Sequence, residues 1–314
     1  MMKMYPSWFT FILLNTTGLA MIMSSPNWLL TWMGFELSLM GFLPMFLMNN
    51  IMIESMIKYL IIQAGGSAIM LLAFMVKLSS YSSKLLLMSM LIKIGMFPFF
   101  QWVPNVMVSM SWMGCLLLST IQKLGPLFML AKISVTMMPI LILMSSAGIL
   151  ISGLMGMNQS LMRPLLGYSS ISHTSWMASA IPFSMNLLII YILIYFPLTM
   201  ILMLKLEKTN TNLLVSKSKN LNQYLNMNLV LITSAGMPPF SIFFLKMILL
   251  YKLMNLPLII LPMLIGTMMS SYFYLSIIIP SLMKIWKMKQ NKKEMILPDL
   301  IFVISMIIPM IMII

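Results

Sequence analysis

Long apolar runs, separated by short polar or proline- and glycine-rich breaks, dominate the pattern of this chain. A helix needs roughly 20 apolar residues to cross a bilayer, and runs of that order recur from end to end. The breaks predict membrane spans near residues 7–24, 26–48, 53–77, 84–98, 112–136, 137–156, 164–181, 184–205, 226–252, 256–283 and 296–314. The segment from Phe99 to Met110 predicts a short connecting helix, and the longest polar stretch runs from Lys205 to Asn228. The pattern therefore predicts an all-α polytopic membrane protein with about eleven transmembrane helices.

The composition supports this class. Hydrophobic residues make up 61% of the chain and charged residues only 8%, and the mean hydropathy is +1.01. Soluble domains carry about 25% charged residues, so an ordinary soluble protein is excluded. The run at residues 7–24 has no small-residue cleavage site and leads straight into another span. We therefore expect it to be a helix and not a removed signal.

The formal net charge of +14 arises because acidic residues are nearly absent. Many lysines fall in two predicted loops: Lys205, Lys208, Lys217 and Lys219 in one, and Lys284, Lys287, Lys289, Lys292 and Lys293 in the other. Two predicted spans separate these loops, so both lie on one side, which the positive-inside rule makes the cytoplasm or the mitochondrial matrix. Counting spans backwards places Lys3, Glu54 and Arg163 on that side, and Lys77 and Lys84 on the other. This distribution indicates orientation and lipid headgroups, not nucleic acid.

Cysteine and histidine are too scarce for this chain alone to hold an iron–sulfur cluster or a structural zinc ion, although one ligand to a site shared with another subunit stays open. One cysteine, Cys115, excludes an internal disulfide, and with one histidine the chain cannot itself supply the ligands of an iron–sulfur cluster or a structural zinc site. Methionine is abundant, at 43 residues, and we interpret it as flexible apolar filler. The excess of Met, Ile, Leu, Asn, Lys and Ser is also typical of AT-rich invertebrate mitochondrial DNA.

Four charged residues lie well inside predicted spans. Glu36 is near the middle of its span, where a carboxylate costs about 2.5–3.5 kcal/mol even on lenient insertion scales. Lys93, Lys123 and Lys246 each lie several residues inside an apolar segment. Two interpretations are open: buried ion pairs that fix helix packing, or groups that move charge across the membrane. The second is favoured.

Other ionisable residues have stronger structural alternatives. Lys58 follows Glu54 by four residues, so an i,i+4 surface pair competes with a functional role. Lys132 and Lys252 lie toward helix ends, from which they can reach the interface. His173, within GYSSISHTSW, is a candidate relay group because imidazole titrates near neutrality, and equally a hydrogen-bonded packing histidine.

Helix-disturbing pairs accompany the intramembrane lysines. Gly95 with Pro98, Gly125 with Pro126, and Gly236 with Pro239 predict broken helices that free backbone carbonyls and admit water beside each lysine. A desolvated lysine holds its proton less firmly than a solvated one, and a nearby carboxylate holds that proton on. A line of such lysines predicts a switchable proton relay. The sequence GMFPF at residues 95–99 is also similar to GMPPF at 236–240. On the count of predicted spans the two segments cross the membrane in opposite directions, as in inverted-repeat transporters.

Six motifs occur in one order along the chain: WMGFE at 32–36, KYLIIQ at 58–63, LIKIGMFPF at 91–99 with WVP at 102–104, QKLGP at 122–126, YSSISH at 168–173, and GMPPF at 236–240 with Lys246. In this order and spacing they resemble the antiporter-like membrane subunits of mitochondrial NADH:ubiquinone oxidoreductase (respiratory complex I), in particular its chain 2 family. The resemblance covers most of the chain.

The resemblance implies a fold and a set of site residues. The fold would be one antiporter-like domain over residues 1–314, built on two inverted five-helix repeats with interrupted helices. The repeats fall near 7–136 and 137–283, followed by a C-terminal helix at 296–314. The three N-terminal helices of the bacterial fold would be absent, which places the N-terminus on the matrix side. The family's buried glutamate and lysine roles fall on Glu36, Lys58, Lys93, Lys123 and Lys246.

Two departures from the family pattern surround the first break. Family members carry Pro-Phe-His-Phe-Trp followed by Pro-Glu, whereas this chain has PFFQW at 98–102 and Pro104-Asn105. A histidine and a carboxylate are therefore missing, which leaves open how protons reach this region.

The expected function is that of a core membrane-arm subunit that takes part in proton translocation across the mitochondrial inner membrane. The chain itself would bind no cofactor; FMN, iron–sulfur clusters, NADH and ubiquinone would belong to other subunits. Expected partners are neighbouring membrane-arm subunits, supernumerary subunits and phospholipids such as cardiolipin. The alternatives are a free-standing cation/proton antiporter, or a non-conducting scaffold of the membrane arm.

Overall fold

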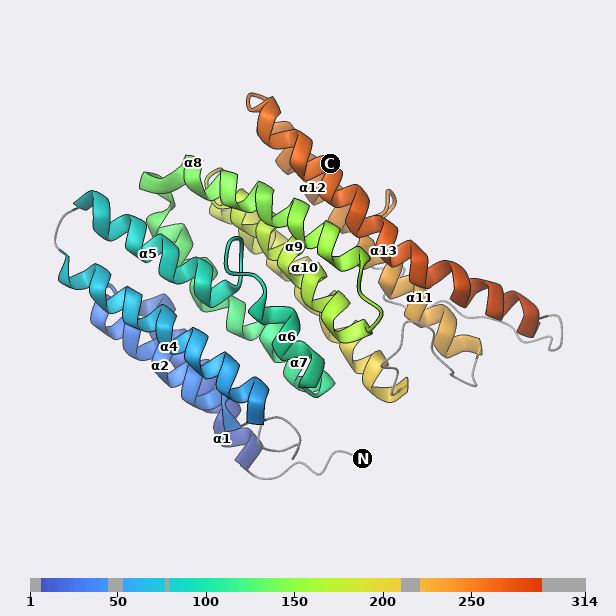
Figure 1. The fold of residues 1–314 in the computed structure, drawn as a ribbon, viewed down its shortest axis with the longest axis horizontal. Coiled ribbons are helices and arrows are strands. Elements are labelled where there is room, and N and C mark those ends of the chain that lie inside the picture. Colours follow the sequence, from blue (N-terminus) through green and yellow to red (C-terminus); the bar gives the residue numbers. More distant parts are fainter. Residues whose placement is uncertain (1–6, 45–52, 77–78, 210–220, 290–314) are drawn as a thin grey trace. The chain divides into compact units, whose positions relative to one another are not determined.

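A computed structural model describes residues 7–44, 53–76, 79–209 and 221–289, and every regular element in these residues is a helix (Figure 1). By internal contacts the chain divides into two compact units, Met1–Met144 and Ser145–Ile314. The helix predicted at 296–314 lies outside the described residues, as do Lys3, Lys77, Lys217, Lys219, Lys292 and Lys293.

The helices of the first unit follow the predicted spans closely. They are α1 (Ser7–Ser24), α2 (Trp28–Phe42), α4 (Ile53–Met75), α5 (Ser79–Ile94), α6 (Trp102–Ser109), α7 (Trp112–Ser119) and the first part of α8 (Ile121–Met157). α6 is the short connecting helix that the sequence predicts. α1 packs on α2, α2 on α4, and α4 on both α5 and α6 (Figure 1, blue to teal).

Aromatic and glycine contacts hold this unit together. Tyr59 of α4 lies between Phe42 of α2, at 5.1 Å between ring centroids, and Trp102 of α6, at 5.9 Å. Gly18 of α1 and Gly34 of α2 face each other so closely that a Cβ atom on Gly18 would lie 2.7 Å from the Gly34 carbonyl oxygen. Small residues at such crossings let backbones approach, which is how helices associate within a bilayer.

The second unit contains the end of α8 and the helices α9 (Met162–Ala180), α10 (Met185–Thr209), α11 (Leu221–Ala235), α12 (Ser241–Lys252) and α13 (Pro257–Lys289). α10 packs against α9, α11 and α12, and α11 packs against α13. Gly153 of α8 and Gly266 of α13 repeat the close glycine approach, because a Cβ atom on Gly153 would lie 2.8 Å from the Gly266 carbonyl oxygen.

Two of the three predicted helix breaks are confirmed. Gly95 ends the α5 region and Gly236 ends the α11 region, and both have φ of +73°, which favours glycine. The predicted span 226–252 is thus two helices, α11 and α12. A boundary between the spans 112–136 and 137–156 is also present, as a kink at Met137 (φ −122°, ψ 19°) two residues before Pro139.

The predicted break at Gly125–Pro126 is wrong. The helix is interrupted earlier, at Thr120 (φ −116°, ψ −83°), and α8 then continues through both residues. Pro126 is the sixth residue of α8, so its missing N–H removes the helical hydrogen bond to the Gln122 carbonyl group without ending the helix. Gly125 serves close packing instead, since an added Cβ atom would lie 3.0 Å from a methyl group of Ile22.

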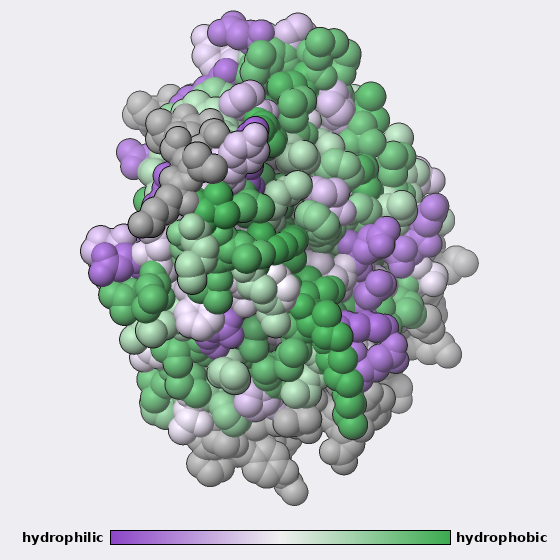
Figure 2. Space-filling model, turned by 60° about the vertical axis from the view of Figure 1, so that its left-hand side comes forward, coloured by the Kyte–Doolittle hydropathy of each residue, from purple (hydrophilic) through white to green (hydrophobic). Residues whose placement is uncertain are grey.

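The outer surface is apolar. Large hydrophobic side chains on α1, α4, α10 and α13 are exposed, and Leu258 is 86% exposed; apolar residues form large connected areas of the face seen in Figure 2 (green), beside a group of hydrophilic residues at its right. A soluble protein rarely exposes apolar patches of this extent, whereas a lipid-facing surface requires them. Five described segments are long and apolar enough to cross a membrane: Ile53–Met75, Trp112–Ile133, Met137–Met157, Met185–Lys208 and Pro257–Met283. The full number of spans stays a prediction.

Candidate functional site

The three lysines predicted inside spans are all buried in the structure. Lys93 is 5% exposed, Lys123 3% and Lys246 7%. A buried ammonium is costly unless other groups compensate its charge, so lysines at such positions indicate a functional or a structural requirement.

Lys93 lies in the last turn of α5 and faces α2. Its Nζ atom is 4.4 Å from the centroid of the Phe35 ring, and the carboxylate of the half-buried Glu36 acts on it electrostatically. These two described side chains form no direct ion pair. The ammonium is therefore held by the face of an aromatic ring and by the field of a carboxylate at longer range, an arrangement that a small displacement of α2 would alter.

The stem of Lys93 runs along α4. Gly66 makes room for it, because a Cβ atom there would lie 3.0 Å from the Lys93 Cγ atom. The methylene groups thus cross a surface of α4 that lacks a side chain, while the ammonium reaches Phe35.

Side chains of other helices donate hydrogen bonds to carbonyl groups at the first break. Gln63 Nε2 on α4 donates to the Lys93 carbonyl oxygen at 3.1 Å, and Trp102 Nε1 on α6 donates to the Ile92 carbonyl oxygen at 3.1 Å. Free carbonyls were expected here from the sequence, but their donors were not identified. Both donors lie within the motifs that carried the resemblance, KYLIIQ and WVP.

Lys123 lies three residues after the Thr120 interruption, beside a polar contact between helices. The neighbouring Gln122 donates through Nε2 to Asn15 Oδ1 of α1 at 2.8 Å. Gly125, half a turn further along, would place a Cβ atom 3.2 Å from the Phe35 ring. Phe35 therefore contacts α8 at Gly125 and also faces the Lys93 ammonium, so Glu36 and Lys93 lie close to the part of α8 that follows Lys123.

Lys246 lies at the second break. Its Nζ atom is close to the backbone of Gly236, because a Cβ atom on that glycine would lie 3.0 Å from it. His173 of α9 is buried at the same break: its Nε2 atom is 3.2 Å from the Ser234 carbonyl oxygen, and its Nδ1 atom is 3.0 Å from the Tyr191 hydroxyl. The structure thus brings Lys246 and His173 to one helix break of the second unit.

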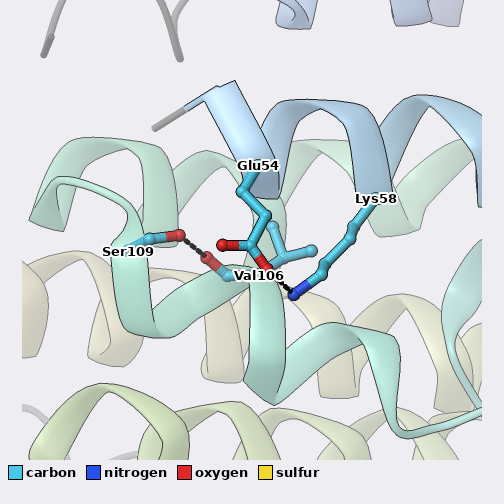
Figure 3. Close-up of polar contacts among 4 residues, drawn as sticks. All are labelled: Glu54, Lys58, Val106 and Ser109. Atoms are coloured by element: carbon cyan, nitrogen blue, oxygen red, sulfur yellow. Dashed lines mark hydrogen bonds and ion pairs between the residues drawn. The ribbon is translucent and has the colours of Figure 1, made fainter. Parts of the chain in front are cut away.

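Lys58 is not buried with the other lysines. It lies near the start of α4, where its side chain is 51% exposed and pairs with Glu54, which is 83% exposed (Figure 3). The i,i+4 pair considered from the sequence is confirmed. Any part that Lys58 plays in proton transfer would therefore occur at the surface of this chain.

Lys132 has a defined contact that sequence reasoning missed. Its Nζ atom donates to the Ser25 carbonyl oxygen at 3.2 Å and to the Ile22 carbonyl oxygen at 3.4 Å, so a cation caps the C-terminus of α1. The contact joins residues more than a hundred positions apart, and only the location of Lys132 toward a helix end hinted at it. A positive charge at a helix C-terminus interacts favourably with the helix dipole.

Replacing Lys132 with methionine is expected to destabilise the first unit by about 1 kcal/mol, because the last carbonyls of α1 lose a charged donor. Thermal dissociation of the subunit from solubilised membranes would show the change. Lys132→Arg keeps a cationic donor and is the control. Equal melting of the methionine, arginine and wild-type proteins would contradict the capping role.

In the described part of the chain, no three His, Cys, Asp or Glu side chains lie together. Cys115 is buried, and its thiol donates to the Met107 carbonyl oxygen at 3.6 Å. The candidate site consists of Lys93 and Lys246 at the two helix breaks and of Lys123, which is buried three residues after the Thr120 interruption.

Comparison with known proteins identifies the family of the chain. The model of the transmembrane family described as NADH:quinone oxidoreductase/Mrp antiporter matches residues 25–273. The chain belongs to this family. NADH-ubiquinone oxidoreductase chain 2 of Balaenoptera musculus is 34% identical and aligned over 96% of each chain, and chain 2 of Lumbricus terrestris is 33% identical over 83% of each. The resemblance seen in the six motifs is confirmed.

The fold is shared with a solved structure. A chain of respiratory complex I from Thermus thermophilus superposes with a TM-score of 0.82 at 19% sequence identity, covering 89% of this chain and 71% of that chain. The two chains therefore share one all-helical fold.

Proposed function

We propose that this chain is the chain 2 membrane subunit of a mitochondrial NADH:ubiquinone oxidoreductase and takes part in proton translocation. Full-length similarity to subunits of that name supports the assignment. The observation that carries the proton-translocating role is the position of Lys93, which is buried at a broken helix with its ammonium against Phe35 and within the field of Glu36.

The proposed roles combine the family resemblance with where the groups lie. Glu36 acts as a switch, since moving its carboxylate relative to Lys93 changes how firmly that lysine holds its proton. Lys93 is the central protonatable site, Lys123 passes charge onward, and Lys246 connects toward the exit or a neighbouring subunit. Lys58, paired with Glu54 at the surface, exchanges charge with a neighbour or with water. The work required is about 2.3 kcal/mol per charge for each 100 mV.

The remaining chemistry is assigned to other subunits. The chain itself binds no redox cofactor, and NADH oxidation, the flavin, the iron–sulfur clusters and quinone reduction belong elsewhere in the complex. Neighbouring membrane-arm subunits, supernumerary subunits and anionic phospholipids such as cardiolipin are the proposed partners. The chain would cross the mitochondrial inner membrane several times with its N-terminus and lysine-rich loops in the matrix, where Lys205 and Lys208 at the end of α10 support this orientation.

Lys246→Met tests the assignment within the second unit, and Lys252→Met is its matched control. Both lysines lie on α12, but Lys246 is buried at the break and Lys252 is exposed near the helix end. We expect Lys246→Met to lower proton pumping by on the order of tenfold in assembled complex, because a protonatable group is lost, and Lys252→Met to leave it unchanged. Pumping per NADH oxidised is measured in inner-membrane vesicles, with assembly checked by native electrophoresis. Equal pumping by both variants would reject the role of Lys246.

Two other functions make different predictions. A free-standing cation/proton antiporter of the same family would migrate alone after gentle solubilisation, whereas a subunit migrates with a very large assembly. A non-conducting scaffold would need these lysines only for folding, so every assembled lysine variant would pump normally.

A further inference from the structure

The two helix breaks share one arrangement. Each ends at a glycine with φ of +73°, and in each the carbonyl oxygen two residues before the glycine accepts a hydrogen bond from a side chain on another helix. At Gly95 the donor is Gln63 Nε2, and at Gly236 the donor is His173 Nε2. A glutamine at one break and a histidine at the other thus bond to the carbonyl group at the equivalent position.

The partners of His173 determine which of its nitrogens carries the proton. A carbonyl oxygen can only accept, so the bond to the Ser234 oxygen requires a proton on Nε2. Nδ1 is then free to accept from the Tyr191 hydroxyl in a neutral ring. The ring of Tyr195 packs against the imidazole at 4.7 Å between centroids. His173 is therefore held in one orientation and one tautomer.

This bond determines the surroundings of Lys246. Ser234 lies two residues before Gly236, where an added Cβ atom would lie 3.0 Å from the Lys246 Nζ atom. A shift in the end of α11 would move that glycine and change the space beside the lysine. The donor on α9 thus connects a third helix to the geometry of the protonatable site.

We infer that His173 is a positioning residue that holds the break between α11 and α12, and that protons do not pass through its ring. Glutamine already performs this task at the first break. In both side chains the donor nitrogen is the same number of bonds from Cβ, and a glutamine amide also supplies an acceptor for Tyr191. A side chain that only donates a hydrogen bond to the carbonyl group at the end of a helix need not be ionisable, whereas a side chain that relays protons must be.

Three variants in the assembled complex test this inference: His173→Gln, His173→Leu and the control Thr174→Val. Thr174 is the buried neighbour whose hydroxyl bonds only to carbonyl groups within α9. We expect His173→Gln and Thr174→Val to pump protons within about twofold of wild type, and His173→Leu to pump at least tenfold less or to assemble poorly. If the glutamine variant assembles but loses pumping as the leucine variant does, the ring itself carries protons and the inference is overturned. Normal pumping by the leucine variant overturns it as well.

A second measurement does not depend on pumping. Hydrogen–deuterium exchange of the peptide that contains residues 230–240 reports opening of the break directly. Exchange should rise in His173→Leu and stay at the wild-type level in His173→Gln; a rise in both, or in neither, contradicts the capping role. The pumping readout rests on the proposed function, but the exchange readout does not. Failure of the proposed function would appear instead as normal pumping by Lys246→Met.

Discussion

Replacing Lys93 with methionine is expected to abolish proton pumping in assembled complex and to lower coupled NADH:ubiquinone activity by on the order of tenfold or more. Methionine has nearly the length of lysine and no charge, so it fills the space between Gly66 and Phe35 without a protonatable group. Packing should survive, since the substitution removes a buried charge from an apolar surrounding. The loss would therefore be one of function and not of folding.

The control for Lys93→Met is Lys84→Met on the same helix, where the exposed ammonium lies 5.6 Å from the Tyr81 ring. Glu36→Gln is the companion variant, because it keeps the shape of the side chain and removes the field that acts on Lys93. Pumping and quinone-linked NADH oxidation are measured in the same vesicles, alongside the amount of assembled complex. Unchanged pumping per electron in assembled Lys93→Met would make the buried charges structural and favour the scaffold.

Much of the fold follows from local features of the sequence. Apolar runs of bilayer length predict α1, α4, α10 and α13 to within a few residues at most of their ends, because lipid leaves the backbone no alternative to a helix. The breaks at Gly95 and Gly236 were also predictable, because glycine and proline disturb the helical turn in which they lie. The interruption at Thr120 was not, because neither a glycine nor a proline stands at that position to mark it.

The buried position of a lysine was predictable where the lysine lies inside a long apolar segment. Lys93, Lys123 and Lys246 lie deep in such runs and are buried, whereas Lys58 follows the polar start of α4 and stays at the surface with Glu54. The groups that hold the site could not be read from the sequence. Gln63 and His173 reach carbonyl groups 30 and 61 residues away, and such pairings depend on how the helices pack.

Gly266→Ala is expected to destabilise the second unit by about 3 kcal/mol, at the upper end of the usual cost of overpacking. A Cβ atom at this position would lie 2.6 Å from the Ile149 carbonyl oxygen, 2.7 Å from the Ile149 carbonyl carbon and 2.8 Å from the Leu150 Cα atom. All three atoms belong to the backbone of α8, so no side-chain rotation can relieve the contact. α8 and α13 must separate, and the dispersion contacts along their crossing are lost.

The same substitution at Gly65 is the control for Gly266→Ala, because a Cβ atom on Gly65 of α4 would meet nothing within 4 Å. Alanine also favours a helix over glycine by about 1 kcal/mol, so Gly65→Ala should be neutral or slightly stabilising. Subunit abundance, assembled complex and thermal dissociation are compared with pumping per NADH oxidised. We expect Gly266→Ala to reduce the amount of assembled complex several-fold while the complexes that form pump normally. That result is opposite to the one expected for Lys93→Met, which keeps its complex and loses pumping. Wild-type abundance of Gly266→Ala would contradict the close approach of α8 and α13, since a backbone contact of this kind leaves a methyl group no room unless the helices are further apart.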